Sequence, residues 1–275
     1  MADGKEAIFS PSGVDNASSD GYNAPKRSYW TEEIDAKRGD LLLLACCFVT
    51  GLLDCSTFRN WATFVSMQTG NTIILCLSTA GLPVGQPWAW AATLISLIAF
   101  FVGAFVCTRL SNAFGPKRRL ILTTNIFLQA LLITLSAALA TASIAISDRN
   151  TTNPSVILHD PRILVSVAPL AFQSGATIAT SRLLGFGNEI PVTVYTSTYA
   201  ALAADPKLFH LHGNTPRNRR VAAVVCVFAG AFVATWAEKR SEGVLVTFWT
   251  SAGIKFVLAG VVAFVFPRKE DQVAV

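Results

Sequence analysis

Long apolar runs, separated by short polar segments, fill most of the chain after residue 40. Because a helix rises about 1.5 Å per residue, roughly 20 apolar residues are needed to cross the ~30 Å hydrocarbon core of a bilayer. Six runs approach or exceed this length: 41–58, 88–108, 120–147, 161–181, 220–237 and 244–267. The pattern therefore predicts an all-α integral membrane protein with six full transmembrane helices.

Two further apolar stretches are interrupted or short. The stretch 62–82 carries Ser66, Gln68, Thr69, Gly70 and Asn71 near its middle, and 190–204 begins beside Pro191 and is rich in Thr, Ser and Tyr. A helix facing lipid does not expose so many polar groups, whereas a helix facing a protein-lined cavity does. We therefore expect two broken or re-entrant helices in addition to the six spans.

The chain also resembles itself. Residues 101–108 (FVGAFVCT) recur as 228–235 (FAGAFVAT), an offset of 127. At the same offset, residues 65–69 align with residues 192–196. This predicts two internal repeats, which is a recurrent plan among transporters. The repeats are expected at 41–147 and 161–267.

Composition supports this interpretation. The chain is 52% hydrophobic and 14% charged, whereas soluble domains average about 25% charged residues. Residues 1–40 hold 13 of the 39 charges and few aliphatic side chains, which predicts a disordered N-terminal tail. The transmembrane domain is expected over 41–267, followed by a C-terminal tail over 268–275. The bases lie at the ends of apolar runs, so we expect the lipid bilayer as partner and no nucleic acid.

Basic residues also indicate the topology. With six spans and a cytoplasmic N-terminus, 13 bases lie inside and 5 outside, whereas eight spans with parallel repeats split them 10 to 8. The positive-inside rule favours six spans, inverted repeats and cytoplasmic termini. The eight-span arrangement remains the alternative. In the six-span arrangement the sequon at Asn150 lies outside the membrane.

Two ionisable residues lie inside apolar runs, where they are costly unless paired or functional. Asp54 lies near the outer end of the first span, and Lys255 is about twelve residues from either end of the last span. We expect a buried Asp54–Lys255 pair. Two alternatives remain open: Asp54 meets water beside Arg59, or Lys255 meets Gln129, with which it aligns at an offset of 126.

The polar interruptions are candidate solute-binding segments. Free backbone N–H groups at the start of a half-helix, with Thr or Asn beside them, favour anions. Two half-helices converging from opposite sides would place such groups at the midplane. Helix–helix packing through small and hydroxylated residues is the alternative. The candidate residues are Gln68, Thr69, Gly70, Asn71, Thr196, Ser197 and Thr198.

Two motifs resemble the signatures of a known family. Gly51-Leu-Leu-Asp54 with Met67-Gln-Thr-Gly-Asn71 resembles the "G-x-x-D … M-T-G-N" signature of the YoaK-like membrane proteins, a domain of unknown function numbered 1275. Ala171-Phe-Gln-Ser174 and the residues 190–198 resemble the second signature, with several departures from it. The resemblance spans about residues 40–267. It implies a multi-spanning fold, adds Gln173 and Ser174 to the candidate solute-binding residues, and supplies no substrate.

Enzymatic chemistry has no support in the sequence. It contains no Ser/His/Asp arrangement, no metal-ligand cluster and no glycine-rich phosphate loop, so we expect no enzyme, no cofactor and no metal. We expect a transporter or channel-like protein that moves a small polar or anionic solute through a cavity lined by the two polar breaks. The alternative is a non-transporting membrane scaffold or partner-binding subunit.

Overall fold

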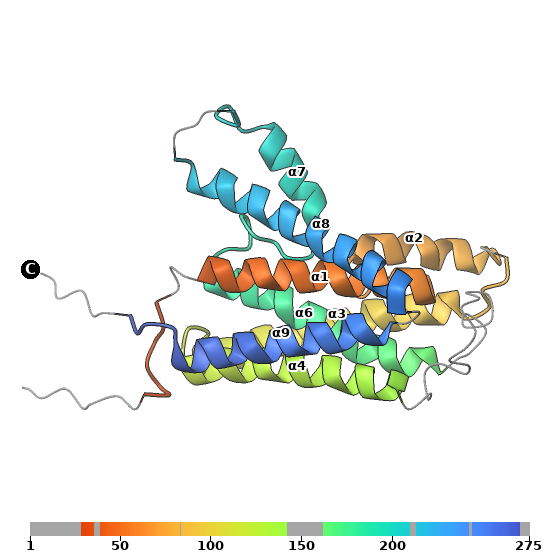
Figure 1. Ribbon diagram of the computed structural model, residues 1–275, viewed down its shortest axis with the longest axis horizontal. Coiled ribbons are helices and arrows are strands. Elements are labelled where there is room, and N and C mark those ends of the chain that lie inside the picture. Colours follow the sequence, from red (N-terminus) through yellow and green to blue (C-terminus); the bar gives the residue numbers. More distant parts are fainter. Residues whose placement is uncertain are drawn as a thin grey trace, which may run out of the picture.

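The computed structural model describes residues 29–35, 39–82, 84–141, 162–209, 213–241 and 244–269. These residues form eight α-helices and no β-sheet, which confirms the all-α prediction. The helices are α1 (Gly39–Trp61), α2 (Gln68–Thr79), α3 (Ala89–Phe114), α4 (Arg119–Thr141), α6 (Ile163–Leu184), α7 (Tyr195–Ala203), α8 (Thr215–Ser241) and α9 (Leu245–Phe264). Figure 1 shows the six long helices as one bundle, with α2 at its right and α7 rising from its upper left.

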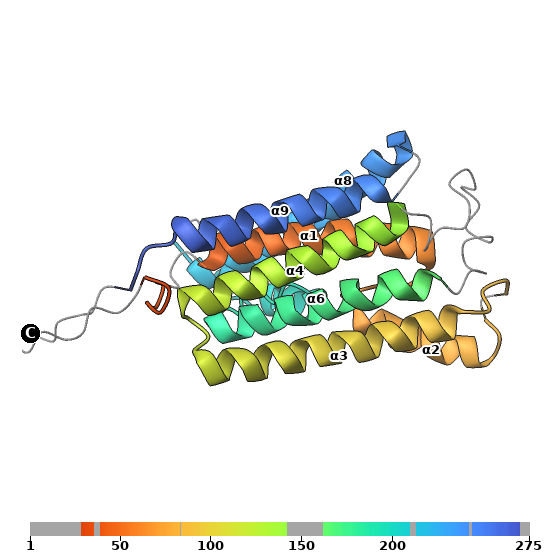
Figure 2. The same ribbon diagram turned by 90° about the horizontal axis from the view of Figure 1, so that it is seen from below.

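Five of these helices, α1, α3, α4, α8 and α9, are long and apolar enough to cross a membrane. They identify the chain as a multi-pass membrane protein. The remaining predicted span, 161–181, corresponds to α6, which is 22 residues long but is not among the five. Polar residues such as Gln173 and Thr177 are buried on it. Because α6 packs between α3 and α4 (Figure 2), protein surrounds much of its surface and it needs less apolar surface than a lipid-facing helix.

The two short helices occupy the polar stretches. The helix α2 has 12 residues and α7 has 9, so they extend about 18 and 14 Å. Neither length crosses a ~30 Å hydrocarbon core. Their first residues, Gln68 and Tyr195, are 127 positions apart. The short helices therefore begin at the offset that the sequence repeat predicts.

Contacts between helix ends define the two ends of the bundle. At one end, Arg219 at the start of α8 pairs with Asp40 at the start of α1 at 3.4 Å. The segment 29–35 joins the same end, because its backbone bonds to Lys117, between α3 and α4, and to Pro267, after α9. We call this the basic end, after the basic residues that collect there. Most of the predicted N-terminal tail, the residues 270–275 of the predicted C-terminal tail and the sequon at Asn150 lie outside the described residues.

The opposite end of the bundle holds the other helix termini. Arg59 in the last turn of α1 pairs with Glu238 near the end of α8 at 3.2 Å. Thr247 at the start of α9 also bonds to Glu238. At the basic end, by contrast, Leu184 at the end of α6 lies beside Gly39 at the start of α1. Hence α1 and α6, the first helices of the two repeats, run in opposite directions.

Connectivity then places the short helices on opposite sides. The helix α2 lies between the end of α1 and the start of α3, which is the opposite end of the bundle. The helix α7 lies between the end of α6 and the start of α8, which is the basic end. In both cases the chain enters the bundle and returns to the end it came from (Figure 1).

The helices α1 and α8 cross at two glycines. A Cβ on Gly51 would lie 2.1 Å from the carbonyl oxygen of Val227, and a Cβ on Gly230 would lie 2.1 Å from that of Phe48. Such backbone contact is possible only because glycine lacks a side chain, as in other small-residue crossings of membrane helices. These two residues therefore set the separation of α1 from α8.

The helices α6 and α3 cross in the same way. A Cβ on Gly175 would lie 2.0 Å from the carbonyl oxygen of Phe100, and a Cβ on Gly103 would lie 2.0 Å from that of Phe172. Every residue of this crossing has its counterpart in the α1–α8 crossing, at an offset of 124 between α1 and α6 and of 127 between α3 and α8. The sequence duplication is therefore also a duplication of helix packing.

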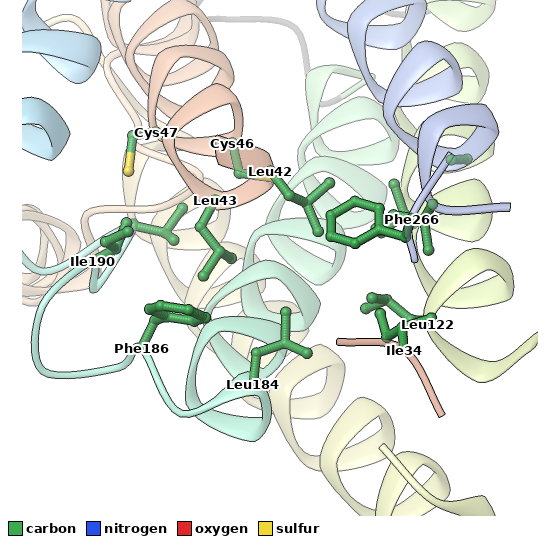
Figure 3. Packing of buried hydrophobic residues seen from close by; sticks show 14 of the residues in the cluster. Ile34, Leu42, Leu43, Cys46, Cys47, Leu122, Leu184, Phe186, Ile190 and Phe266 are labelled. Atoms are coloured by element: carbon green, nitrogen blue, oxygen red, sulfur yellow. The ribbon is translucent and has the colours of Figure 1, made fainter. Parts of the chain in front are cut away.

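Two large buried apolar clusters and a small one, formed by Cys107, Ala176 and Ala179, fill the bundle. The cluster toward the basic end includes Leu43, Ile126, Leu184 and Phe266 (Figure 3). The cluster toward the opposite end includes Val49, Ile133, Leu170 and Phe248. Val192, which precedes α7, is wholly buried in the first cluster, and Val65, which precedes α2, is wholly buried in the second. Polar side chains of α4, α6 and α9 lie between the two clusters along these helices.

Candidate functional site

Lys255 lies in the middle of α9 and is 1% exposed. It is about 15 Å along the helix from either end. Its ammonium donates hydrogen bonds to Gln129 Oε1 at 2.6 Å, to Thr177 Oγ1 at 3.1 Å and to Cys46 Sγ at 3.4 Å. These acceptors come from α4, α6 and α1, so one charged group joins four helices.

Asp54 does not pair with Lys255, and the predicted ion pair is wrong. The carboxylate of Asp54 instead accepts hydrogen bonds from the backbone N–H groups of Val65 at 2.9 Å and Ser66 at 2.8 Å. Lys255 contacts α1 at Cys46, which is eight residues before Asp54 and hence about 12 Å away along the helix axis. Gln129, the alternative partner, is the one that the structure places beside Lys255.

A set of hydrogen bonds extends from Lys255 toward the loop before α2. Thr177 contacts Gln173, whose amide nitrogen donates to Ser174 Oγ at 2.9 Å. Ser66 Oγ in turn bonds to Ser174 Oγ at 3.0 Å. The candidate residues Gln173 and Ser174 therefore lie between Lys255 and the first break. We call this set the central polar layer, which consists of Lys255, Gln129, Thr177, Gln173, Ser174 and Ser66.

Asn71 fixes the loop before α2. Its Oδ1 accepts the backbone N–H of Phe64 at 3.0 Å, and its Nδ2 donates to the carbonyl oxygen of Phe64 at 2.7 Å. The same amide nitrogen lies 2.9 Å from Gln68 Oε1 and 3.1 Å from Ser96 Oγ. Asn71 is wholly buried. Its hydrogen-bonding groups are engaged in packing, so it does not present them to a solute.

The other candidate residues of the first break lie around Asn71 and its hydrogen bonds. Gln68 Nε2 donates to the carbonyl oxygen of Val65 and to Ser96 Oγ. Gly70 lies against the Phe64 ring, so a Cβ there would approach it to 3.0 Å. Thr69 is exposed on α2. The first break is thus a packed loop followed by a half-helix.

The candidate residues of the second break are less enclosed. Thr196 and Ser197 are exposed, and Ser197 Oγ donates to the carbonyl oxygen of Val194 at 3.2 Å. Thr198 is the one buried residue of α7, as Asn71 is of α2, and the two are 127 positions apart. The hydroxyl of Thr198 also bonds within its own turn. The structure does not join the two breaks into one solute site.

A cavity of about 430 Å³ lies beside the second break. Gly185, which ends α6 in the left-handed conformation, reverses the chain there. The walls come from the last turns of α6, the loop 185–191 and the first turn of α7. The lining residues include Ile178, Arg182, Asn188, Pro191, Val194 and Ser197. Of the predicted candidate residues, the cavity reaches Ser197.

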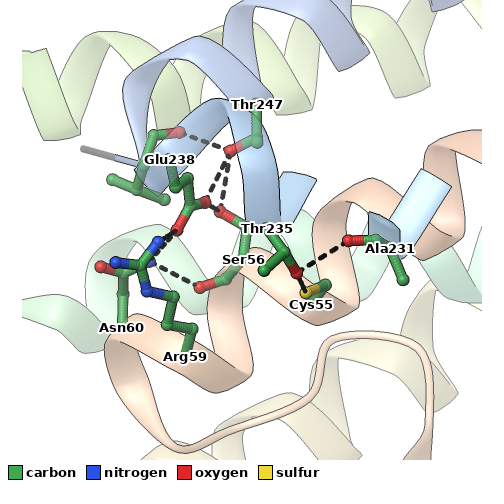
Figure 4. A network of polar contacts seen from close by, with 9 residues as sticks. Cys55, Ser56, Arg59, Asn60, Ala231, Thr235, Glu238 and Thr247 are labelled. Carbon is green, nitrogen blue, oxygen red and sulfur yellow. Dashed lines mark hydrogen bonds and ion pairs between the residues drawn. The ribbon is translucent and has the colours of Figure 1, made fainter. Parts of the chain in front are cut away.

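A second polar cluster closes the opposite end of the bundle (Figure 4). Glu238 is 2% exposed and bonds to Ser56, to Asn60 Nδ2 at 2.9 Å and to Thr247 Oγ1 at 3.2 Å. It also pairs with Arg59, which is half exposed. Glu238 therefore ties the helices α1, α8 and α9 together at this end.

Several of these residues are not apparent from the sequence. Thr177 and Cys46 are ordinary residues of apolar runs, and neither carries a motif. Glu238 stands next to Lys239 and Arg240, which suggests a solvated helix end. Its burial depends on the approach of α1 and α9. Glu238 is nevertheless an acid that directly follows the apolar run 220–237, and that position is the signal that could have identified it.

Comparison with known proteins gives one family. A family model described as "Protein of unknown function (DUF1275)" matches residues 42–261, which cover most of both predicted repeats. No curated protein and no solved structure matches the chain.

Proposed function

This chain belongs to the DUF1275 family, and on that premise we propose that it is a membrane transporter for a small polar or anionic solute. The family description assigns no activity, so the proposal is based on the chain's own geometry. The observation that carries it is the environment of Lys255. A fully buried ammonium lies at mid-helix and bonds to two oxygens and a sulfur, all from side chains that carry no carboxylate.

An unmatched positive charge at this depth is costly and is characteristic of substrate or ion pathways. If the purpose of Lys255 were only to hold helices together, a carboxylate partner would neutralise it at lower cost. Glu238 and Asp54, the acids inside the bundle, bond elsewhere. The ammonium of Lys255 therefore has no carboxylate partner, and an anionic solute can neutralise it when the surrounding helices move.

The membrane arrangement in this proposal has six spans. The helix α6 is the sixth span, and α2 and α7 are re-entrant half-helices that enter from opposite sides. The repeats are inverted, as in many secondary transporters. The basic end faces the cytoplasm, because short cytoplasmic loops accumulate Lys and Arg. Both termini then lie on the cytoplasmic side, and the cluster around Glu238 lies outside.

Transport is tested in liposomes that contain the purified protein. Uptake of a panel of small polar and anionic solutes, including urea, glycerol, acetate, succinate and phosphate, is compared with uptake into protein-free liposomes. We expect at least one solute to enter faster with the protein present. The Lys255→Met variant is expected to lose that uptake, because it removes the charge of the central polar layer.

The matched control is Lys239→Gln, which removes an exposed lysine from the end of α8. It should transport as the unmodified protein does. Thermal unfolding in detergent verifies that both variants fold. Uptake that is unaffected in a folded Lys255→Met variant would contradict the proposal, as would a complete absence of uptake across the panel.

The topology is tested by labelling single cysteines from each side of the membrane. Val84, after α2, and Lys207, after α7, are both exposed. In a background lacking the more accessible native cysteines Cys55, Cys76 and Cys226, six spans predict an external label at residue 84 and a cytoplasmic label at residue 207. Eight spans with parallel repeats predict cytoplasmic labels at both positions.

A non-transporting scaffold is the second candidate. The observation that favours it is the engagement of Asn71, because the most polar residue of the first break serves only the packing of Phe64 and Ser96. In that case the central polar layer also serves packing. Substitution of Lys255 would then change stability, and the protein would move no solute.

A further inference from the structure

The two halves of the bundle differ at one pair of equivalent positions. The offset of 124 that relates α1 to α6 through their glycine crossings places Ile178 at the position of Asp54. In the first half, the carboxylate of Asp54 accepts the backbone N–H groups of Val65 and Ser66, just before α2 begins. In the second half, the corresponding side chain is apolar and supplies no acceptor.

The second half has a cavity at this place. Ile178 lines the cavity of about 430 Å³, together with Val194 and Ser197 from the start of α7. Val194 precedes the helix and provides no side-chain cap for the N–H groups of its first turn. Helix N-termini attract anions through these N–H groups and the helix dipole. The cavity therefore has a wall that favours negative charge.

A cation also lines the cavity. Arg182 is exposed, and within the described parts of the chain its guanidinium makes neither a hydrogen bond nor an ion pair. The nearby acid Glu189 does not neutralise it, because Glu189 pairs with Arg219 at 2.8 Å. A Cβ on Gly187 would lie 2.8 Å from Arg182 Cγ, so glycine at 187 leaves room for this side chain along the loop. Arg182 is thus a free donor at the cavity.

One buried hydroxyl in the segment that leads into α7 lacks a partner. Thr193 lies between Pro191 and Val194, which both line the cavity. It is 5% exposed, and its Oγ1 has no hydrogen-bond partner. The equivalent residue of the first half is Ser66, at an offset of 127, and its hydroxyl bonds to Ser174. Buried hydroxyls are normally satisfied, so the Thr193 hydroxyl is a donor without an acceptor, whereas its backbone N–H already donates to the carbonyl oxygen of Pro191.

We propose that this cavity binds the carboxylate of a small solute, in the place that the carboxylate of Asp54 takes in the first half. Arg182 supplies a charged donor of the kind that pairs with carboxylates, often through two N–H groups. Since each water takes about 30 Å³, the cavity accommodates a short-chain carboxylate with some water. The inference rests on the proposed function for its meaning, because it names the substrate class of the transporter. The binding site itself is tested without transport.

The probe is succinate, and its neutral isostere succinamide is the matched ligand. Binding to the full-length protein in detergent is measured by titration calorimetry. We expect succinate to bind and succinamide not to bind. Arg182→Gln should weaken succinate binding by about ten-fold or more, because it removes a charge-assisted hydrogen bond. Lys207→Gln, which removes an exposed base of the same end outside the cavity, should leave the affinity unchanged.

A second pair of variants tests the equivalence of the two halves. Ile178→Asp introduces an internal carboxylate at the position equivalent to Asp54, so it should abolish succinate binding. Ile178→Asn has nearly the shape of Asp without its charge, so it should lose less succinate affinity than Ile178→Asp does. Because Ile178→Asp places a charge at a mostly buried position, its folding is verified by thermal unfolding. If it does not fold, the Arg182→Gln and Lys207→Gln pair decides.

Three results would overturn the inference. These are equal binding of succinate and succinamide, an unchanged affinity in Arg182→Gln, and a clear preference for inorganic phosphate over succinate. The outcome is separable from that of the proposed function. Succinate binding without uptake into liposomes leaves the site intact and refutes transport, whereas uptake without binding at this cavity refutes only the site.

Discussion

Lys255 of α9 and Gln129 of α4 bond to each other at 2.6 Å, although they occupy equivalent positions of the two repeats. In a structure built from two inverted halves, equivalent residues meet only near the axis that relates them. The contact between α4 and α9 therefore lies at that axis. One half supplies the charge and the other supplies the acceptor, so the duplication has become asymmetric at its centre.

The bond between these residues predicts a non-additive effect on stability. Gln129→Leu leaves the buried ammonium with two acceptors and should lower the free energy of unfolding by roughly 1.5–3 kcal/mol, the range for a hydrogen bond to a charged group. Adding Lys255→Met should restore part of this loss, because the charge no longer needs an acceptor. Denaturant unfolding of the two single variants and the double variant measures the coupling. Additive losses would mean that the two side chains act independently.

Asp54 is predicted to act as a hydrogen-bond acceptor for the loop before α2. Asp54→Asn retains an oxygen that can accept the N–H groups of Val65 and Ser66, so it should cost less than about 1 kcal/mol. Asp54→Leu leaves both N–H groups without an acceptor and should lower the free energy of unfolding by roughly 2 kcal/mol or more. Thermal unfolding of the two variants distinguishes them. A large loss of stability in Asp54→Asn would indicate that the negative charge itself is required.

Asn71 is predicted to determine the stability of the first break. Asn71→Leu removes the acceptor and the donor that satisfy the backbone of Phe64, at a cost of roughly 1–3 kcal/mol for each buried group left unpaired. Thr69→Leu, on the exposed side of the same helix, should change the stability by less than about 0.5 kcal/mol. The measurement is the unfolding midpoint in detergent. Similar losses in both variants would show that the helix, and not the amide, is sensitive.

Gly51 is predicted to tolerate no side chain. In Gly51→Val the added atoms meet the backbone of α8, and the helices must separate, at a cost of at least roughly 1–3 kcal/mol. Gly253 on α9 has no atom within 4 Å of a Cβ position, so Gly253→Ala should be neutral or stabilising by up to about 1 kcal/mol. Expression level and unfolding midpoint report both effects. A well-folded Gly51→Val variant would show that α1 and α8 are free to move apart.

Glu238 is predicted to matter more than its ion-pair partner. Arg59 is half exposed, and exposed ion pairs contribute about 0–1 kcal/mol, so Arg59→Gln should be mild. Glu238→Ala removes the acceptor shared by Asn60 and Thr247 inside the protein and should cost roughly 2 kcal/mol or more. Unfolding at low and at high salt tests this order. Equal losses, both abolished by salt, would indicate a surface ion pair only.

The starts of the short helices were predictable from sequence. The half-helix beginning at Gln68 and its counterpart at Tyr195 each carry a local run of polar residues in the first turn, and such a run marks the interruption of an apolar stretch. The all-helical, multi-pass character was likewise predictable, because hydropathy is read along the chain. The contacts that the residues of these segments make depend on the tertiary structure. Asn71 appeared as a solute ligand in isolation and serves as a clamp on Phe64 in the fold.

The sequence alone could not decide which residue pairs with Lys255, and the reason is physical. Asp54 and Gln129 were both compatible with its depth, and electrostatics favoured the acid. The choice depends on how α1 and α4 are shifted along their axes relative to α9, and the glycine crossings set the position of α1 against α8. A shift of two helical turns along α1 brings Cys46, and not Asp54, to the ammonium.

The sequence by itself determined that this protein belongs in a membrane and which residues are polar where lipid would not tolerate them. Those properties follow from transfer of each segment from water to hydrocarbon, which depends on the segment alone. Only the tertiary structure decided which polar groups meet. In it Lys255 bonds to Gln129, and Asp54 accepts hydrogen bonds from the loop before α2. A cavity lies at Ile178, where the second half has no carboxylate. Hydrogen bonds act over about 3 Å, so their partners are fixed by helix crossings that no single segment encodes.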